Sequence, residues 1–141
     1  MRIFIAAILA LCTLSSVHAQ APINFGGTWW SERCSKMDVK VGAGGLLSGT
    51  YASPVAAGGA TYPLTGFRAG VDLIAFSVNF GPTNSLASWA GQHTVIAGVE
   101  VIMTMWLVTN DVPDDQELAR LWASTLTGYD NFRRGKPSYC G

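Results

Sequence analysis

Short stretches in which apolar and polar residues alternate occupy most of the chain, and small or glycine-rich segments separate them. Alternation with period two is typical of strands that bury one face. Acidic residues followed by apolar residues at helical spacing predict one or two helical turns at 114–122, in the loop before the last strand. The alternating pattern predicts eight strands, at 28–32, 36–41, 46–53, 62–68, 72–80, 85–94, 99–109 and 123–132. This number is close to that at which a closed antiparallel barrel holds one small ligand, so we predict an all-β fold of this type.

The N-terminal segment has the features of a signal peptide. Arg2 gives a short positive start, residues 3–14 are nearly all apolar, and residues 17–19 have the small-residue pattern of a cleavage site. The apolar run is too short to span a membrane in the mature protein. We therefore expect a secreted or periplasmic protein with a signal peptide at 1–19, one β-barrel domain at 20–134 and a C-terminal tail at 135–141.

Composition argues against several kinds of partner. The chain carries nine basic and nine acidic residues, and Arg2 is the only charged residue of the predicted signal peptide. A mature domain with a charge close to zero and no basic run lacks the electrostatic surface that nucleic acids require. No basic amphipathic helix suggests membrane binding. Cys34 and Cys140 remain in the mature chain, where export permits a structural disulfide, within one chain or between two.

The inward face of the predicted strands is unusual for a barrel that is only packed, because Leu, Ile and Val normally fill such an interior. Here aromatic residues near strand ends converge with several hydroxyl groups and one carboxylate, as in a preformed pocket for a small ligand. Each of these residues alone has an ordinary structural explanation, and it is their joint occurrence that indicates a pocket. The predicted inward positions are Trp29, Ser31, Arg33, Tyr51, Ser53, Phe76, Val78, Phe80, Ser85, Ala87, Trp89, Gly91, Thr104, Trp106, Val108, Leu126, Gly128 and Asp130.

Six runs, in order and with matching spacing, resemble the avidin and streptavidin family of biotin-binding proteins. They are GTWW at 27–30, LSGTYAS at 47–53, YPLTG at 62–66, SWAGQ at 88–92, TMWL at 104–107 and WASTLTGYDNF at 122–132. The resemblance covers about residues 27 to 132, which is nearly the whole mature domain. It implies an eight-stranded up-and-down barrel that binds biotin with high affinity, and without catalysis, in a pocket buried at one end.

The resemblance also implies roles for individual residues. Ser35 and Tyr51 would donate hydrogen bonds to the ureido oxygen of biotin, and Ser53 and Asp130 would accept from its two nitrogens. Asp130 should remain ionised if it accepts such bonds. Ser85 and the backbone amide of Ala57 would hold the valeryl carboxylate. The full set of expected biotin-binding residues is Ser31, Ser35, Tyr51, Ser53, Val55, Ala57, Phe80, Ser85, Ala87, Trp89, Trp106, Val108, Trp122 and Asp130.

The chain departs from the family pattern at several pocket positions. Ser31 stands where an Asn usually donates a further bond to the ureido oxygen, and Ala87 stands where a Thr usually contacts the sulfur. Arg33 occupies a position that is usually apolar or small, and Phe80 replaces a more usual Trp. Losing one or two hydrogen bonds worth about 1 kcal/mol each would weaken binding roughly five- to thirty-fold. The function should survive this loss, but the affinity has to be measured.

The sequence also bears on the oligomeric state of the protein and on alternative functions. In the family, a tryptophan at the position of Trp122 closes the pocket of a neighbouring subunit, so we expect a homotetramer, with a dimer as the alternative. The first rival function is an exported barrel that carries another small apolar ligand. Catalysis is not expected, because His93 is the only histidine after residue 19 and no catalytic set can be placed around it. No metal site and no cofactor are expected either.

Overall fold

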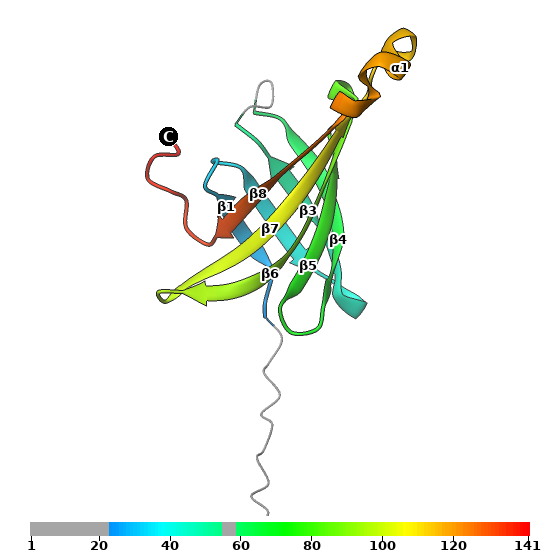
Figure 1. Ribbon diagram of the computed structural model, residues 1–141. Coiled ribbons are helices and arrows are strands. Elements are labelled where there is room, and N and C mark those ends of the chain that lie inside the picture. The colour runs from blue at the N-terminus through cyan, green and yellow to red at the C-terminus, as the bar shows by residue number, and fades with distance from the viewer. Residues whose placement is uncertain (1–22, 55–58) are drawn as a thin grey trace, which may run out of the picture.

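The computed structural model describes residues 23–54 and 59–141. Eight strands form one closed barrel, each antiparallel to its neighbours along the chain, with β8 closing on β1 (Figure 1). The strands are β1 (Gly27–Ser31), β2 (Lys36–Val41), β3 (Leu46–Ala52), β4 (Thr61–Ala69), β5 (Leu73–Asn79), β6 (Ser85–Ile96), β7 (Val99–Asn110) and β8 (Thr125–Arg133). The predicted fold class is confirmed. The predicted signal peptide at 1–19 lies outside the described residues.

The period-two pattern becomes an alternation of buried and exposed side chains. In β5, Ile74, Phe76 and Val78 are buried, and the residues between them are exposed. Burying one face of every strand of a closed sheet produces a single interior core. The largest fully buried side chains of this core include Trp29, Phe25 and Phe132.

Strand boundaries differ from the prediction where tertiary structure intervenes. The hairpin of β6 and β7 is longer than expected, because pairing continues to Ile96 opposite Val99. Strand β8 begins at Thr125 and not at 123, since the residues before it form a 3-10 turn. Leu126 lies opposite Val108, which lines the cavity, and so shares the inner face as predicted, but it is 55% exposed because it lies at the start of β8, at the mouth of the barrel.

The segment between β7 and β8 forms an arm that projects from one end of the barrel (Figure 1). It consists of the 3-10 turn η4 (Asp114–Gln116), the short helix α1 (Glu117–Arg120) and the 3-10 turn η5 (Leu121–Ala123). This matches the one or two helical turns expected there. Leu118 and Trp122 are fully or largely exposed on the arm, so neither contributes to the core of this chain.

The barrel end opposite the arm, where β6 joins β7, is closed by a polar network over buried rings. Arg134 stacks on Trp29 with its guanidinium carbon 3.7 Å from the ring centroid, and its Nε donates to Glu100 at 3.1 Å. Two further guanidinium nitrogens donate to backbone carbonyls. The ring of His93 packs edge-on against Phe25 and Trp29, and its Nε2 lies 3.2 Å from Glu100 Oε1. We call this the closed end.

The C-terminal tail is fastened to the turn between β1 and β2. A disulfide joins Cys34 to Cys140 within the chain, which decides between the two pairings that the sequence left open. Tyr139 adds a hydrogen bond from its hydroxyl to the carbonyl of Glu32. The tail is therefore tied to the turn that follows β1, whose pairing with β8 has two residue pairs in register, against twelve between β6 and β7.

In the part of the chain that the structure describes, no helix combines the length and apolar character needed to cross a membrane.

Candidate ligand-binding site

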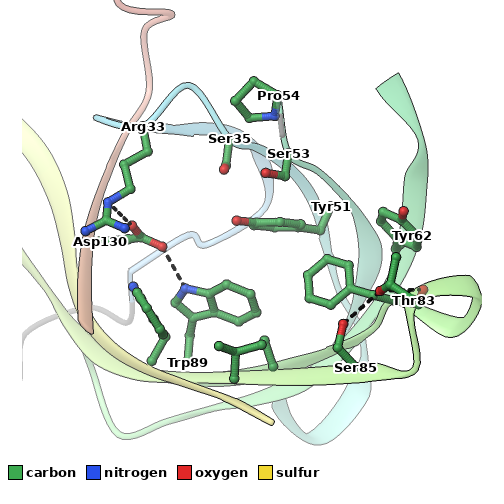
Figure 2. Close-up of a pocket in the computed structure, with 14 residues that line it drawn as sticks. Arg33, Ser35, Tyr51, Ser53, Pro54, Tyr62, Thr83, Ser85, Trp89 and Asp130 are labelled. Carbon is green, nitrogen blue, oxygen red and sulfur yellow. Dashed lines mark hydrogen bonds and ion pairs between the residues drawn. The ribbon is translucent and has the colours of Figure 1, made fainter. Parts of the chain in front are cut away.

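A cavity of about 410 Å³ lies inside the barrel at the end formed by the turns that follow β1, β3 and β5. We call this the open end. The volume is in the range of pockets that enclose one small organic molecule. The cavity is lined by Arg33, Ser35, Tyr51, Ser53, Pro54, Tyr62, Phe80, Thr83, Ser85, Ala87, Trp89, Trp106, Val108 and Asp130 (Figure 2).

Aromatic rings from neighbouring strands form one wall of the cavity. Trp89 of β6 stacks on Phe76 of β5, with ring centroids 5.0 Å apart and an angle of 9° between the ring planes. Tyr51 of β3 lies 5.0 Å from Trp89, and Phe80 packs edge-on against Tyr51 and Tyr62. Because each ring is held by another, this wall is formed before any ligand arrives.

Trp106 of β7 lines the cavity and depends on a glycine of the adjacent strand. Gly128 of β8 lies opposite it in register. A Cβ at Gly128 would lie 2.4 Å from Cζ2 of the Trp106 ring, closer than any real contact of this kind. Only a residue without a side chain therefore leaves room for the indole in its present position.

Asp130 of β8 is the one carboxylate among the residues that line the cavity. Its Oδ2 accepts a hydrogen bond from Trp89 Nε1 at 2.9 Å, whereas its Oδ1 is buried without a hydrogen-bond partner. Burial raises the pKa of Asp130, and the negative charge of Glu32 acts in the same direction, against the Trp89 bond and the Arg33 charge. A buried acceptor without a partner is unusual and marks a place where a ligand donor is needed.

Tyr51 places a phenol group in the same cavity. Its burial raises the pKa of the phenol to about 12, with the nearby Asp130 charge adding to the effect. The side chain therefore remains a neutral hydroxyl, able to donate a hydrogen bond, over the whole physiological pH range.

Smaller hydroxyl groups complete the polar lining. Ser35 and Ser53 border the cavity near Tyr51, and Figure 2 shows their side chains on the same side of the pocket. Across the cavity, Thr83 and Ser85 form a hydroxyl pair with their oxygens 2.8 Å apart. The first group is near Asp130 and the second is at the rim, so the cavity presents polar groups at two separate places.

Ser31 does not line the cavity. Its side chain is fully buried, and its hydroxyl accepts the backbone N–H groups of Arg33 and Ser35, each at 3.2 Å. Backbone bonds from Ser31 to Ser35 and from Cys34 to Ser31 close the same turn. The hydroxyl therefore positions the turn that carries Arg33 and Ser35, which a pattern of alternating residues does not reveal.

The structure brings together most of the expected binding residues. Trp122 lies on the arm, 85% exposed, with its indole N–H bonded to Ala119 of the same arm. Val55 and Ala57, which were also expected to bind the ligand, lie outside the residues that the structure describes. The expected residues that line the cavity are Ser35, Tyr51, Ser53, Phe80, Ser85, Ala87, Trp89, Trp106, Val108 and Asp130.

Four lining residues were absent from the expected binding set, namely Arg33, Pro54, Tyr62 and Thr83, although Arg33 was predicted to face inward. Pairing of the predicted strands could have indicated Tyr62, because it lies opposite Tyr51 in the β3–β4 register and so faces the same side of the sheet. Pro54 and Thr83 are on turns, where strand alternation does not apply. Among the described residues, no cluster of three metal-ligating side chains is present.

The fold and the cavity together define a class of protein, the closed eight-stranded antiparallel barrel with a ligand-sized pocket at one end. The comparisons with known proteins are more specific. The model of the Avidin family matches residues 19–135. The chain is 30% identical to avidin-related protein 4/5 of Gallus gallus over 135 residues, which covers 90% of this chain and 88% of the relative. The crystal structure of Xenavidin superposes with a TM-score of 0.71 at 28% identity, covering 79% of this chain and 97% of the other. The chain belongs to the Avidin family.

Proposed function

We propose that this protein binds biotin, without catalysis, in the cavity at the open end of the barrel. The observation that carries the proposal is the buried Asp130 Oδ1, which accepts no hydrogen bond, has Arg33 Nε at 3.5 Å and lies in an aromatic-walled cavity with the Tyr51 phenol. Such an acceptor needs an N–H donor from the ligand, since leaving it unpaired costs about 1–3 kcal/mol. Membership of the Avidin family supports biotin as the ligand that supplies it.

A ureido group fits the polar part of the cavity. It is planar, with one acceptor oxygen between two N–H donors. We assign one N–H to Asp130 Oδ1, the other to the hydroxyl of Ser53, and the oxygen to the hydroxyls of Tyr51 and Ser35. In a cavity from which water is excluded, each of these bonds is stronger than in solution.

The remaining parts of biotin have complements of their own. The bicyclic ring is apolar apart from the urea, and the walls formed by Phe80, Trp89 and Trp106 would enclose it. The hydroxyl pair of Thr83 and Ser85 is placed at the rim, where it would donate to the valeryl carboxylate. We include Val55 and the backbone of Ala57 in this part of the site on the family resemblance alone.

The departures from the family pattern predict weaker binding of biotin, because contacts to it are lost. Ser31 does not line the cavity, and its oxygen accepts from two backbone N–H groups of its own turn, so its hydroxyl is not placed to donate to the ureido oxygen. Ala87 lines the cavity without a hydroxyl for the sulfur. We expect an affinity below that of a member with both contacts by roughly five- to thirty-fold.

Titration with biotin, followed by calorimetry and by tryptophan fluorescence, tests the proposal. Trp89 and Trp106 line the cavity, so saturable quenching or a blue shift is expected at one biotin per chain. Retention on immobilised biotin, with elution by free biotin, is the second readout. A chain that is not retained and gives no heat with biotin, yet binds an apolar dye in the cavity, would support the rival carrier function instead.

We further propose a homotetramer in which Trp122 reaches the pocket of a neighbouring chain. The support is the exposure of Trp122 on the arm, together with large outward apolar side chains on the barrel wall. These are Phe67, Met105, Leu107 and Tyr129, each more than half exposed. An exposed apolar surface of this kind is typical of an interface between subunits.

Light scattering of the wild type and of Trp122→Lys tests this assembly. The variant should lose both assembly and biotin affinity, with Leu118→Lys on the same arm as the control for an added charge. A variant with unchanged mass and affinity would contradict the cross-subunit role. A mass of two chains in the wild type would replace the tetramer by a dimer.

We also propose that the protein is exported, with cleavage after residue 19. The Cys34–Cys140 disulfide supports this location, because such bonds persist in oxidising compartments. N-terminal sequencing of the protein recovered outside the cytoplasm should begin at Gln20, and an intact Met1 on the recovered protein would contradict the proposal.

A further inference from the structure

Glu32 lies at the point where the pairing of β1 with β8 ends. The last pair of residues in register is Ser31 with Phe132. Glu32 would come next, opposite Asn131, but β1 ends at Ser31 and the chain turns away. The side chain of Glu32 takes over the pairing, because its Oε2 accepts the backbone N–H of Asn131 at 2.6 Å. The ladder between the two strands is thus extended by one hydrogen bond to a side chain.

This hydrogen bond holds the peptide group that follows Asp130, the residue that carries the acceptor of the proposed function. The C=O and N–H of a trans peptide point in opposite directions. The N–H of this peptide points to Glu32, and its C=O, which belongs to Asp130, accepts from Thr104 Oγ1 of β7 at 2.9 Å. One side chain from each neighbouring segment therefore fixes the peptide group, on both sides of β8.

The orientation of that peptide group sets the position of the Asp130 carboxylate. Figure 2 shows this carboxylate directed toward the side chains of Trp89 and Arg33, inside the cavity. A rotation of the adjacent peptide would move the side chain and shift Oδ1 away from the ligand. Because a hydrogen bond weakens steeply when its angle departs from the optimum, the affinity of the site depends on what holds this peptide.

The charge of Glu32 does not explain its place beside the site. Burial raises the pKa of Asp130, and the negative charge of Glu32 raises it further. Glu32 therefore opposes the ionised form of Asp130, which is the form that accepts from a ligand. Its main chain is also fastened, since its carbonyl accepts from the Tyr139 hydroxyl at 3.2 Å. What Glu32 offers to the site is a firmly placed acceptor for the N–H of Asn131.

We infer that Glu32 is a positioning residue for the ligand, whose carboxylate holds the peptide group after Asp130 and so keeps the Asp130 acceptor directed at the ligand. The inference rests on the proposed binding of biotin and adds a residue that sets its strength. Glu32 is not among the residues that line the cavity, so its effect on the ligand is transmitted through Asp130.

Amide hydrogen exchange and the rate of biotin dissociation test the inference in Glu32→Ala and Glu32→Gln. Glu32→Ala removes the acceptor, so the amide of Asn131 should exchange faster. Biotin should dissociate about tenfold faster, on the scale of one hydrogen bond to a charged group. Glu32→Gln retains an oxygen at this place and should bring both measurements back close to the wild-type values. Both variants keep the contact with the tail, because Tyr139 binds the main chain of residue 32.

A double-mutant cycle with Asp130→Ala separates positioning from a general effect on the fold. Once the acceptor is gone, Glu32→Ala should change biotin dissociation little further, whereas its effect on the free energy of unfolding should persist. Asp72→Ala is the matched control. It removes a carboxylate that also accepts a side-chain hydrogen bond at 2.6 Å, from Gln92, but it lies on the turn between β4 and β5 at the closed end.

Wild-type biotin dissociation in Glu32→Ala would overturn the inference and leave the proposed function intact. The same conclusion would follow if Glu32→Gln failed to restore binding, or if the substitutions at 32 and 130 acted additively on dissociation. It would also follow if Asp72→Ala weakened binding as much as Glu32→Ala. A wild type that does not bind biotin would overturn the proposed function and the inference together.

Discussion

The two ends of the barrel contain similar residues, but their charged groups differ in whether they are hydrogen-bonded. At the closed end, Trp29, Arg134 and Glu100 form a network in which the charged groups have partners. At the open end, Trp89, Arg33 and Asp130 are arranged in a comparable way, but Asp130 Oδ1 has no hydrogen bond. A satisfied network stabilises the fold, whereas an unsatisfied one is available to a ligand.

The pKa values of the carboxylates at the two ends are shifted in opposite directions. Burial opposes the ionisation of Glu100, but hydrogen bonds from Arg134 and His93 outweigh it, and the pKa of Glu100 is lowered. For Asp130 the balance is reversed, and burial raises its pKa. Ionisation of the carboxylate is therefore favoured by its surroundings at the closed end and opposed at the open end. The predictions below separate stability from binding.

Removal of the disulfide should have the largest effect, because it is the covalent support of the open end. Cys34→Ser with Cys140→Ser should lower the free energy of unfolding by about 2–5 kcal/mol, since the bond closes a long loop. Denaturant unfolding and biotin dissociation, each with and without a reducing agent, measure the effect. The reduced wild type should match the double variant, and the double variant should not respond to the reducing agent. Wild-type dissociation that is unaffected by reduction would show that the β1–β2 turn is held without the disulfide.

Asp130→Asn should separate binding from stability most clearly. Loss of the charged acceptor should weaken biotin binding by roughly ten- to hundredfold, as expected for one hydrogen bond to a charged group. The free energy of unfolding of the empty protein should not decrease, because a desolvated charge has been removed. Calorimetry and denaturant unfolding of the same preparation provide the two measurements. A large loss of stability with unchanged binding would contradict the difference between the two ends.

Gly128→Ala should damage the open end through packing alone. The new Cβ displaces the Trp106 ring, which should lower the free energy of unfolding by about 1–3 kcal/mol and weaken biotin binding. Gly135→Ala is the matched control, since a Cβ there meets no atom within 4 Å. Equal behaviour of the two variants in fluorescence titration would show that the position of Trp106 is unimportant.

Arg134→Gln should affect the closed end and leave the open end nearly unchanged. The variant loses the stacking on Trp29 and most of the hydrogen bonds of the guanidinium, which should lower the free energy of unfolding by about 1–2 kcal/mol. The biotin dissociation constant should change little, because no atom of Arg134 lines the cavity. A marked loss of affinity would mean that the two ends are coupled.

The smallest effect should be the pH dependence, in which the two carboxylates have opposite signs. Because the folded-state pKa of Asp130 is raised, its contribution to the stability of the empty protein decreases as the pH rises from its ordinary value through the raised one. The lowered pKa of Glu100 contributes stability above its ordinary value, and this is lost as the pH falls through the lowered value. Biotin affinity should fall as Asp130 becomes protonated. Unfolding and binding curves across the acidic range, with Asp130→Asn as the reference, measure each contribution.

The sequence by itself determined the strands and the residues of the pocket wall. Strand β2 was predicted with the bounds that the structure has, Lys36–Val41, because alternation is a local property that each strand carries in its own residues. The same alternation placed Tyr51, Trp89 and Asp130 on the inner face. The family resemblance, and not the alternation, supplied the ligand.

Only the tertiary structure decided how the turns and ends of the barrel are used. It directed the Ser31 hydroxyl to the backbone of its own turn, placed Arg33 beside Asp130, and joined Cys34 to Cys140 across a sequence separation of 106 residues. Turn residues have no period to follow, and their contacts join segments that are distant in the chain. For that physical reason the strand residues that line the pocket could be predicted, whereas the hydrogen bonds and the ion pair made by its turn residues could not.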